Sequence, residues 1–156
     1  PISPVLHEHL FEYKTHMMQN YGAGVQACYR GPRLYDTPET QAAVTEVIQW
    51  YKKYRDILNS DMIHLRRPDA RDWDGFIHVN PHKKEKGLAM FFNPTHQEIT
   101  RTIHIPLYYT GLTQTARIRE KEQKPVTYKL NRDYTVELTV KIPANGYTWY
   151  VVEAAD

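Results

Sequence analysis

The spacing of the hydrophobic residues changes from a helical to a strand-like period near Ser60, and this change constrains the fold more than any other feature. Before it, apolar residues recur every three or four positions, at Val44, Val47, Ile48, Tyr51, Tyr54 and Leu58. This stripe is typical of an amphipathic helix of about five turns. After it, Val136, Leu138, Val140 and Ile142 alternate with polar residues. Strict alternation predicts a strand with one buried face.

Residues 61–156 are predicted to form an antiparallel β-sandwich. The expected strands are short and lie at 62–66, 76–79, 88–92, 102–107, 116–119, 126–130, 135–142 and 147–152. Turn-forming pairs such as Asn93-Pro94 and Asn145-Gly146 separate them. About eight short strands with turns between them favour a sandwich or a barrel.

Residues 1–60 are predicted to form a helix, a strand and a second helix. The first helix is expected at 4–19, where apolar residues at helical spacing follow Ser3-Pro4, an N-cap and first-turn proline. Residues 25–29 are a short apolar run that suits a buried strand. Thr37-Pro38 repeats the cap signal and begins the second helix.

A single strand between two helices has no neighbour within residues 1–60 that could pair with its edges. Two arrangements would resolve this. Either the strand joins the sandwich, with the helices packed on its face, or the segment is the last unit of a parallel α/β barrel whose earlier units precede it. We therefore predict a mainly β protein, an antiparallel β-sandwich preceded by a helix-strand-helix unit that resembles the last part of an α/β barrel.

The composition argues against several classes of partner. The 20 Lys and Arg residues are balanced by 18 Asp and Glu residues, so a net charge of +2 provides little field to hold a nucleic acid. No apolar run approaches the about 20 residues of a membrane-spanning helix. Cys28 is the single cysteine and cannot close an intrachain disulfide. We expect neither a nucleic-acid nor a membrane partner, and the sequence leaves the compartment open.

Asp69, Asp72 and Asp74 are candidates for catalytic carboxylates, because paired carboxylates perform glycoside hydrolysis. They alternate with Arg66, Arg67 and Arg71. Ion pairing would lower the pKa values of these carboxyl groups and remove the acid of raised pKa that the chemistry needs, so we expect a structural turn. Trp73, at the tip of this loop, is expected either to stack on a sugar ring or to pack onto the sandwich.

The histidines do not form a recognisable metal site. His7 and His9 would lie about 200° apart around a helix and cannot chelate one ion together. His78 and His82 could meet across a turn, but no further ligands follow at a suitable spacing. We predict no catalytic residue, no metal and no cofactor.

Four segments carry a resemblance to a known family. YGAGVQACYRG (21–31) lies between the two helices, and WYKKYRDIL (50–58) resembles a last barrel helix. GLAMFFNP (87–94) resembles a sandwich strand and turn, and IPANGY (142–147) precedes the final strand. In this order they resemble the C-terminal part of the α-galactosidase-like glycoside hydrolases, whose architecture is a (β/α)8 barrel followed by a β-sandwich.

The resemblance implies that the catalytic carboxylates belong to earlier barrel strands, outside this sequence. The chain would then be a non-catalytic C-terminal part whose partners are an upstream catalytic barrel in the same polypeptide, supported by the sandwich, and a carbohydrate. Because the carboxyl ends of barrel strands face the active site, Cys28, Tyr29 and Arg30 would lie nearest the substrate. We expect Arg30 to bind a sugar hydroxyl or a neighbouring carboxylate, and the alternative is an ion pair with Asp36.

Two other hypotheses stay open. In the first, the chain is a free-standing carbohydrate-binding module whose stacking face is provided by Trp73, Tyr108, Tyr109, Trp149 or Tyr150. In the second, it is a structural or partner-binding sandwich. Its helices would then dock on another subunit through exposed Leu6, Leu10, Tyr13 and Met17.

Overall fold

The computed structural model describes residues 5–25 and 33–155, which belong to two compact units, Pro1–Leu58 and Asn59–Asp156. The described part of the first unit is helical, and the second contains the eight strands. The change of hydrophobic period near Ser60 therefore coincides with the change from helices to strands. The predicted mainly β fold class is confirmed.

The helical unit contains a 3-10 turn, η1 (Leu6–His9), and two helices, α1 (Leu10–Gly22) and α2 (Pro38–Leu58). Helix α1 begins and ends later than predicted, and Ser3 and Pro4 lie outside the described residues. Its end is set by Gly24, which has a left-handed φ of 71° and whose amide donates to the Tyr21 carbonyl at 3.0 Å. The residue that ends this helix is thus Gly24.

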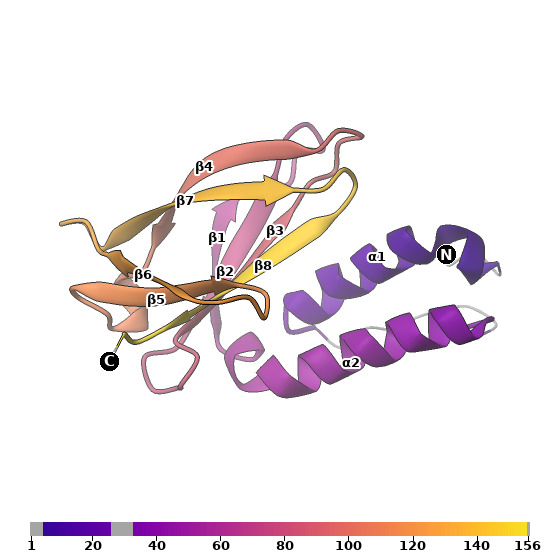
Figure 1. Ribbon diagram of the computed structural model, residues 1–156, viewed down its shortest axis with the longest axis horizontal. Coiled ribbons are helices and arrows are strands. Elements are labelled where there is room, and N and C mark those ends of the chain that lie inside the picture. Colours follow the sequence, from indigo (N-terminus) through magenta and orange to yellow (C-terminus); the bar gives the residue numbers. More distant parts are fainter. Residues whose placement is uncertain (1–4, 26–32, 156) are drawn as a thin grey trace. The chain divides into compact units, whose positions relative to one another are not determined.

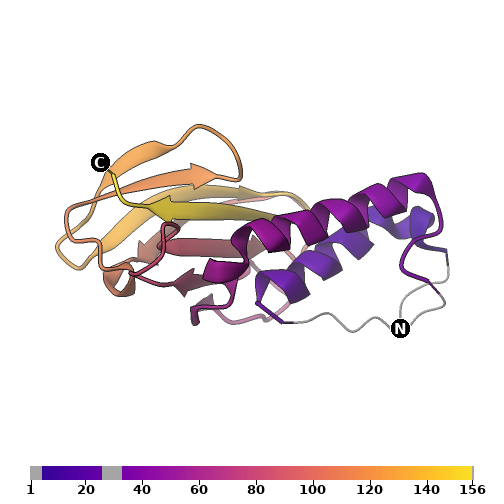
Figure 2. The same ribbon diagram turned by 90° about the horizontal axis from the view of Figure 1, so that it is seen from below.

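Helices α1 and α2 run in the same direction, as Figures 1 and 2 show. Contacts between their side chains fix this orientation. Lys14 Nζ lies 2.9 Å from Glu46 Oε1, and the rings of Tyr21 and Tyr51 pack with 5.2 Å between their centroids. Later positions on α1 therefore meet later positions on α2.

Two parallel helices require that the chain between them return along their length. The connecting residues 23–37 span about 50 Å when extended, whereas α1 is about 20 Å long, so the connection has room for a strand and its turns. Helix, returning segment and parallel helix is the connectivity of an α/β barrel unit. The predicted strand at 25–29 lies, apart from Val25, outside the described residues.

The start of α2 is the capping structure that Thr37-Pro38 predicts. The Thr37 amide donates to Thr40 Oγ1 at 3.0 Å, and the Thr40 amide donates to Thr37 Oγ1 at 3.3 Å. This reciprocal pair satisfies two amides that the helix itself leaves without partners. Pro38, at the first helical position, has no amide hydrogen to satisfy.

All eight predicted strands are confirmed. Their bounds are β1 (Asp61–Arg66), β2 (Asp74–Val79), β3 (Gly87–Phe92), β4 (Ile99–Pro106), β5 (Thr115–Glu120), β6 (Val126–Lys129), β7 (Thr135–Ile142) and β8 (Tyr147–Glu153). A second 3-10 turn, η2 (Tyr108–Thr110), lies between β4 and β5. One sheet has the order β1-β2-β3-β8-β5-β6, the other pairs β4 with β7, and all paired strands are antiparallel.

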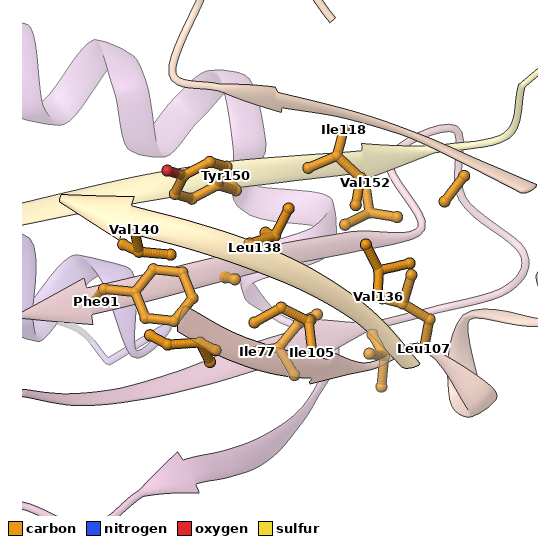
Figure 3. Packing of buried hydrophobic residues seen from close by; sticks show 14 of the residues in the cluster. Ile77, Phe91, Ile105, Leu107, Ile118, Val136, Leu138, Val140, Tyr150 and Val152 are labelled. Atoms are coloured by element: carbon orange, nitrogen blue, oxygen red, sulfur yellow. The ribbon is translucent and has the colours of Figure 1, made fainter. Parts of the chain in front are cut away.

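The two sheets enclose one hydrophobic core, shown in Figure 3. The apolar residues of β7, from Val136 to Ile142, all point into it, as their alternation predicts. Phe91 is fully buried there, and its ring meets that of Tyr150 edge to face at 5.8 Å. Complete burial of one such side chain stabilises the fold by about 1.5–3 kcal/mol.

The helix side chains that the partner-binding hypothesis places on the surface are buried or half-buried. Leu6, Tyr13 and Met17 are buried in the folded chain, and Leu10 is half-buried. The expectation that these four residues are exposed and drive association is therefore wrong. Helical spacing identifies the apolar face of a helix, but it does not say whether the chain itself or another subunit covers that face.

Candidate functional site

The amino-terminal ends of α1 and α2 lie together at one end of the helical unit (Figure 1). This end is formed by η1 and residues 33–37. In α/β barrels, the loops that lead from strands into helices carry the active site. Residues 33–37 occupy the sequence position of such a loop, directly before α2. Tyr29 and Arg30, the predicted substrate contacts, precede them and lie outside the described residues.

Asp36 connects the two helix ends. Its side chain is only 4% exposed, and its Oδ2 accepts the His7 amide at 3.2 Å and lies 2.7 Å from His7 Nδ1. Oδ1 accepts the hydroxyl of Thr40 at 3.1 Å. Burial opposes ionisation, but the hydrogen bonds from His7 and Thr40 outweigh it and lower the pKa of Asp36 to about 2. Arg30, the alternative ion-pair partner predicted for Asp36, lies outside the described residues, so that pair stays a prediction.

We expect Asp36→Asn to lower the melting temperature of the helical unit by a few degrees at neutral pH. The depressed pKa means that the ionised carboxylate stabilises the fold above about pH 4 and that this contribution is lost as the pH falls toward about 2. The difference from the wild type should therefore shrink over this range. Thermal melts followed by circular dichroism at 222 nm measure it.

Asp61→Asn is the matched control, because Asp61 is an exposed aspartate at the start of β1. It should leave the melting temperature unchanged at every pH. An Asp36→Asn effect of equal size from neutral to acidic pH would show that the charge contributes nothing.

Two apolar side chains are presented beside Asp36. Leu34 and Tyr35 are 48% and 45% exposed. The carbonyl of Leu34 accepts the hydroxyl of Tyr13 at 2.9 Å, which anchors the segment to α1. A fixed backbone with exposed apolar side chains is suited to contact a ligand or another part of a protein.

The loop between β1 and β2 is a structural turn, as expected. Arg66 binds Asp69 in a bidentate pair, with Nη2 to Oδ2 at 2.8 Å and Nη1 to Oδ1 at 3.2 Å. Asp69 Oδ1 also accepts the amides of Arg71 and Asp72. The hydrogen bonds from Arg66 and from the Arg71 amide hold the pKa of Asp69 well below its usual range.

The other two aspartates of this loop depart from the prediction. Asp72 pairs with Arg101 of β4, at 3.1 Å, and not with a neighbouring arginine. Burial raises the pKa of Asp74, which is the opposite of the predicted direction, and the charge of Arg66 opposes this shift. A raised pKa would suit Asp74 as an acid catalyst. Glycoside hydrolysis also needs a second carboxyl group, and the neighbouring Asp69 and Asp72 are both bound by arginine side chains.

Trp73 is half-buried on the edge of the sandwich core. Its ring packs against Phe91 with 5.9 Å between centroids, and its carbonyl accepts Arg66 Nη1 at 2.6 Å. The second of the two expectations, packing onto the sandwich, therefore describes its position. Stacking of Trp73 on a sugar stays a prediction.

The described residues offer no metal site. Among residues 5–25 and 33–155, no group of three or more His, Cys, Asp or Glu side chains could hold a metal ion. His78 is buried, and its Nδ1 lies 3.3 Å from the Ser60 carbonyl oxygen. In the same part of the chain, no helix has the length and apolar character needed to cross a membrane.

Of the five aromatic residues considered for a stacking face, the sandwich exposes two. Trp149 and Tyr150 are buried in β8 and are excluded, and Trp73 is half-buried. Tyr108 and Tyr109 in η2 are exposed. The sequence pattern of β8 could not show that Trp149 and Tyr150 are both buried, because alternation marks only one buried face and both faces of this strand are covered.

A parallel helix pair followed by an antiparallel sandwich is the arrangement expected at the end of a barrel-plus-sandwich fold. Solved structures share it. They include a GH27 β-L-arabinopyranosidase from Geobacillus stearothermophilus, with a TM-score of 0.62 and 11% identity over 94% of this chain. α-Galactosidase I from Mortierella vinacea has a TM-score of 0.58 and 13% identity over 92% of the chain. An α-amylase from Geobacillus thermoleovorans has a TM-score of 0.60 and 12% identity over 94%.

The chain spans about a third of these proteins, 31%, 35% and 34% of their respective lengths. No protein-family model and no curated protein sequence matches it. At these identities the similarity shows the fold alone, and it confirms the fold that the resemblance to α-galactosidase-like hydrolases implies. The named activities of the three structures differ, so the fold does not choose between them.

Proposed function

We propose that the chain is the C-terminal part of a carbohydrate-active glycoside hydrolase and is not catalytic on its own. The observation that carries the proposal is the parallel orientation of α1 and α2, which the Lys14–Glu46 and Tyr21–Tyr51 contacts give. The predicted strand at 25–29 would complete a barrel unit between them. A barrel unit of this kind pairs with strands on both sides, so it needs further units to complete its sheet. The solved structures with this fold named above are glycoside hydrolases about three times as long.

The catalytic groups would lie upstream in the same polypeptide. Glycoside hydrolysis needs two carboxyl groups about 5–10 Å apart, and one of them acts as an acid with a raised pKa. Asp69 and Asp72 are each held by an arginine, and Asp36 is held by His7 and Thr40. These carboxylates stabilise the chain's own structure, which agrees with a supporting role.

Residues 33–37 would face the substrate in the whole enzyme. Leu34 and Tyr35 would line the approach to the active site, and Tyr29 and Arg30 would lie closer to the sugar. Arg30 would hydrogen-bond a sugar hydroxyl, since its planar donor groups match paired oxygen acceptors. Stacking of a sugar on Trp73, whose ring packs on Phe91, stays a prediction and has no part in the proposal.

The sequence that precedes Pro1 in the reading frame tests this proposal. We expect about 200 or more residues with the repeating strand and helix pattern of a barrel. The longer polypeptide should hydrolyse nitrophenyl glycosides of galactose or arabinopyranose, or a maltooligosaccharide, and the 156-residue chain should not. A reading frame without a barrel, or hydrolysis by the 156-residue chain alone, would contradict the proposal.

A further inference from the structure

The sandwich carries an exposed aromatic cluster at η2. Tyr108 and Tyr109 are 61% and 63% exposed, more than any other large hydrophobic side chain among residues 5–25 and 33–155. Their rings meet edge to face, with 5.1 Å between centroids and 87° between planes. The ring of Tyr134 packs against Tyr108 at 5.4 Å, also edge to face.

The backbone beneath this cluster is fixed. Leu107 and Thr110, on either side of the two tyrosines, are completely buried. The Thr110 amide and hydroxyl both donate to the Leu107 carbonyl, and Gly111 closes the turn with a left-handed φ of 78°. The two tyrosine side chains are therefore presented by a rigid turn, which lowers the entropy cost of binding.

Tyr134 is held in a conformation that is costly for a tyrosine. Its φ is 64°, in the left-handed region that favours glycine, and its carbonyl accepts the Leu107 amide at 2.9 Å. Strained backbone positions of bulky residues are concentrated at ligand sites. The strain here places a third ring against Tyr108.

The turn that carries Tyr134 is polar. Asn131, Arg132 and Asp133 immediately precede Tyr134 in the exposed turn between β6 and β7. Hydrogen bonds from the Thr135 hydroxyl and amide lower the pKa of Asp133, so this carboxylate accepts hydrogen bonds at neutral pH. Amide, guanidinium and carboxylate groups beside aromatic rings are the groups that bind sugar hydroxyls and sugar ring faces.

We propose that Tyr108, Tyr109 and the turn 131–134 form a binding site on the sandwich for one sugar ring of a soluble oligosaccharide. The choice of a carbohydrate rests on the proposed function. The chemistry agrees with it, because two exposed rings among polar side chains are too small an apolar surface for a stable protein interface. The turn 131–134 has no net charge, because Arg132 balances Asp133, so it provides no positive field to hold the phosphates of a nucleic acid.

The angle between the two tyrosine rings further restricts which carbohydrates can bind. Two rings at 87° cannot form one flat platform, so they cannot lie along the face of a crystalline polysaccharide. They form a corner that receives a single ring. The site should therefore bind soluble chains and not insoluble crystalline ones.

The test uses the full 156-residue chain with two soluble probes, maltoheptaose and a galactosylated mannopentaose, and crystalline cellulose as the insoluble comparison. We expect one soluble probe to bind in calorimetry and to shift the amide resonance of Gly111, which donates to the Tyr108 carbonyl. Tyr109→Ala should weaken binding about tenfold, the loss of one stacking contact. Tyr109→Phe should keep most of the affinity, because it keeps the ring.

Phe11→Ala is the matched control, since it removes an exposed aromatic ring from the helical unit, in α1. Resonance spectra of each variant establish that it is folded. The proposal is overturned if neither soluble probe binds at millimolar concentration, if Tyr109→Ala binds as the wild type does, or if Phe11→Ala loses as much affinity. The reading frame upstream of Pro1 tests the proposed function independently of Tyr108 and Tyr109. The proposed function and the sugar site can therefore each fail while the other holds.

Discussion

Gly75→Ala is expected to destabilise the sandwich by about 3 kcal/mol, with a fall in melting temperature on the order of 10 °C. A Cβ at Gly75 would lie 2.5 Å from the carbonyl oxygen of Met90 and 3.1 Å from the ring of Phe91. Alanine gains only about 0.4–1 kcal/mol by restricting the unfolded chain, so the clash decides the sign. Because Met90 O is a backbone atom, relief requires β2 and β3 to separate.

Gly87→Ala provides the comparison within the same sheet. Gly87 lies at the other end of the β2–β3 pairing, opposite Val79, and its nearest contact would be Val152 Cβ at 3.2 Å. This contact is 0.7 Å longer than the 2.5 Å contact at Gly75, so its relief needs a shift of only a few tenths of an ångström, and this variant should lose at most about 1 kcal/mol. Urea unfolding measures both variants, and an equal loss in the two would contradict the argument.

Trp73 lies beside Gly75. A Cβ at Gly75 would lie 3.4 Å from the Trp73 ring, an ordinary van der Waals distance, and the same ring packs on Phe91. The tryptophan of this loop thereby extends the core of the sandwich. If Gly75→Ala displaces the ring, the fluorescence of Trp73 should shift toward longer wavelength.

The strands of the sandwich could be predicted from the sequence because their signals are local. Alternation along β7 and turn chemistry at Asn93 and Asn145 depend on residues within a few positions of one another. The start of α2 at Thr37-Pro38 was predictable for the same reason. The end of α1 was missed, because two glycines follow closely and the left-handed conformation belongs to the second, Gly24.

The partners of the polar side chains could not be predicted, because they come from distant parts of the chain. Asp72 is paired with Arg101 across 29 positions, although four arginines lie closer in sequence. Asp36 is bound by His7, also 29 positions away. The burial that raises the pKa of Asp74 depends likewise on the assembled fold. Spacing identifies which residues can form ion pairs, but tertiary structure selects the pairs that form.

Some features of the candidate site could likewise be predicted from the sequence, and others depend on the assembled fold. Aromatic residues can be counted from the sequence, but burial separates Tyr108 and Tyr109 from Trp149 and Tyr150. The direction of α2 relative to α1, which supports the proposed barrel origin, is likewise a property of the fold. The functional proposal thus depends on geometry more than on any motif.

Asn93→Ala is expected to cost about 3 kcal/mol of unfolding free energy, because Asn93 is buried and joins two loops of the sandwich. Its Nδ2 donates to the carbonyls of Gln97 at 2.7 Å, Pro143 at 3.1 Å and Ile142 at 3.2 Å. Its Oδ1 accepts the amide and the hydroxyl of Thr95. Alanine leaves these groups without their partner in a site that water reaches poorly.

Asn93→Asp separates the donor from the acceptor role of this side chain. The carboxylate keeps the bonds from Thr95 but turns an acceptor toward the carbonyls of Gln97 and Pro143, so its pKa should rise in the folded state. Stability should then increase as the pH falls, because the protonated acid can donate to one of these carbonyls.

Asn131→Ala, which removes an exposed bond to Thr135, should cost less than about 1 kcal/mol. Urea unfolding at neutral and mildly acidic pH measures all three variants, and an Asn93→Asp protein with the same stability at both would contradict the role of Asn93 as a donor.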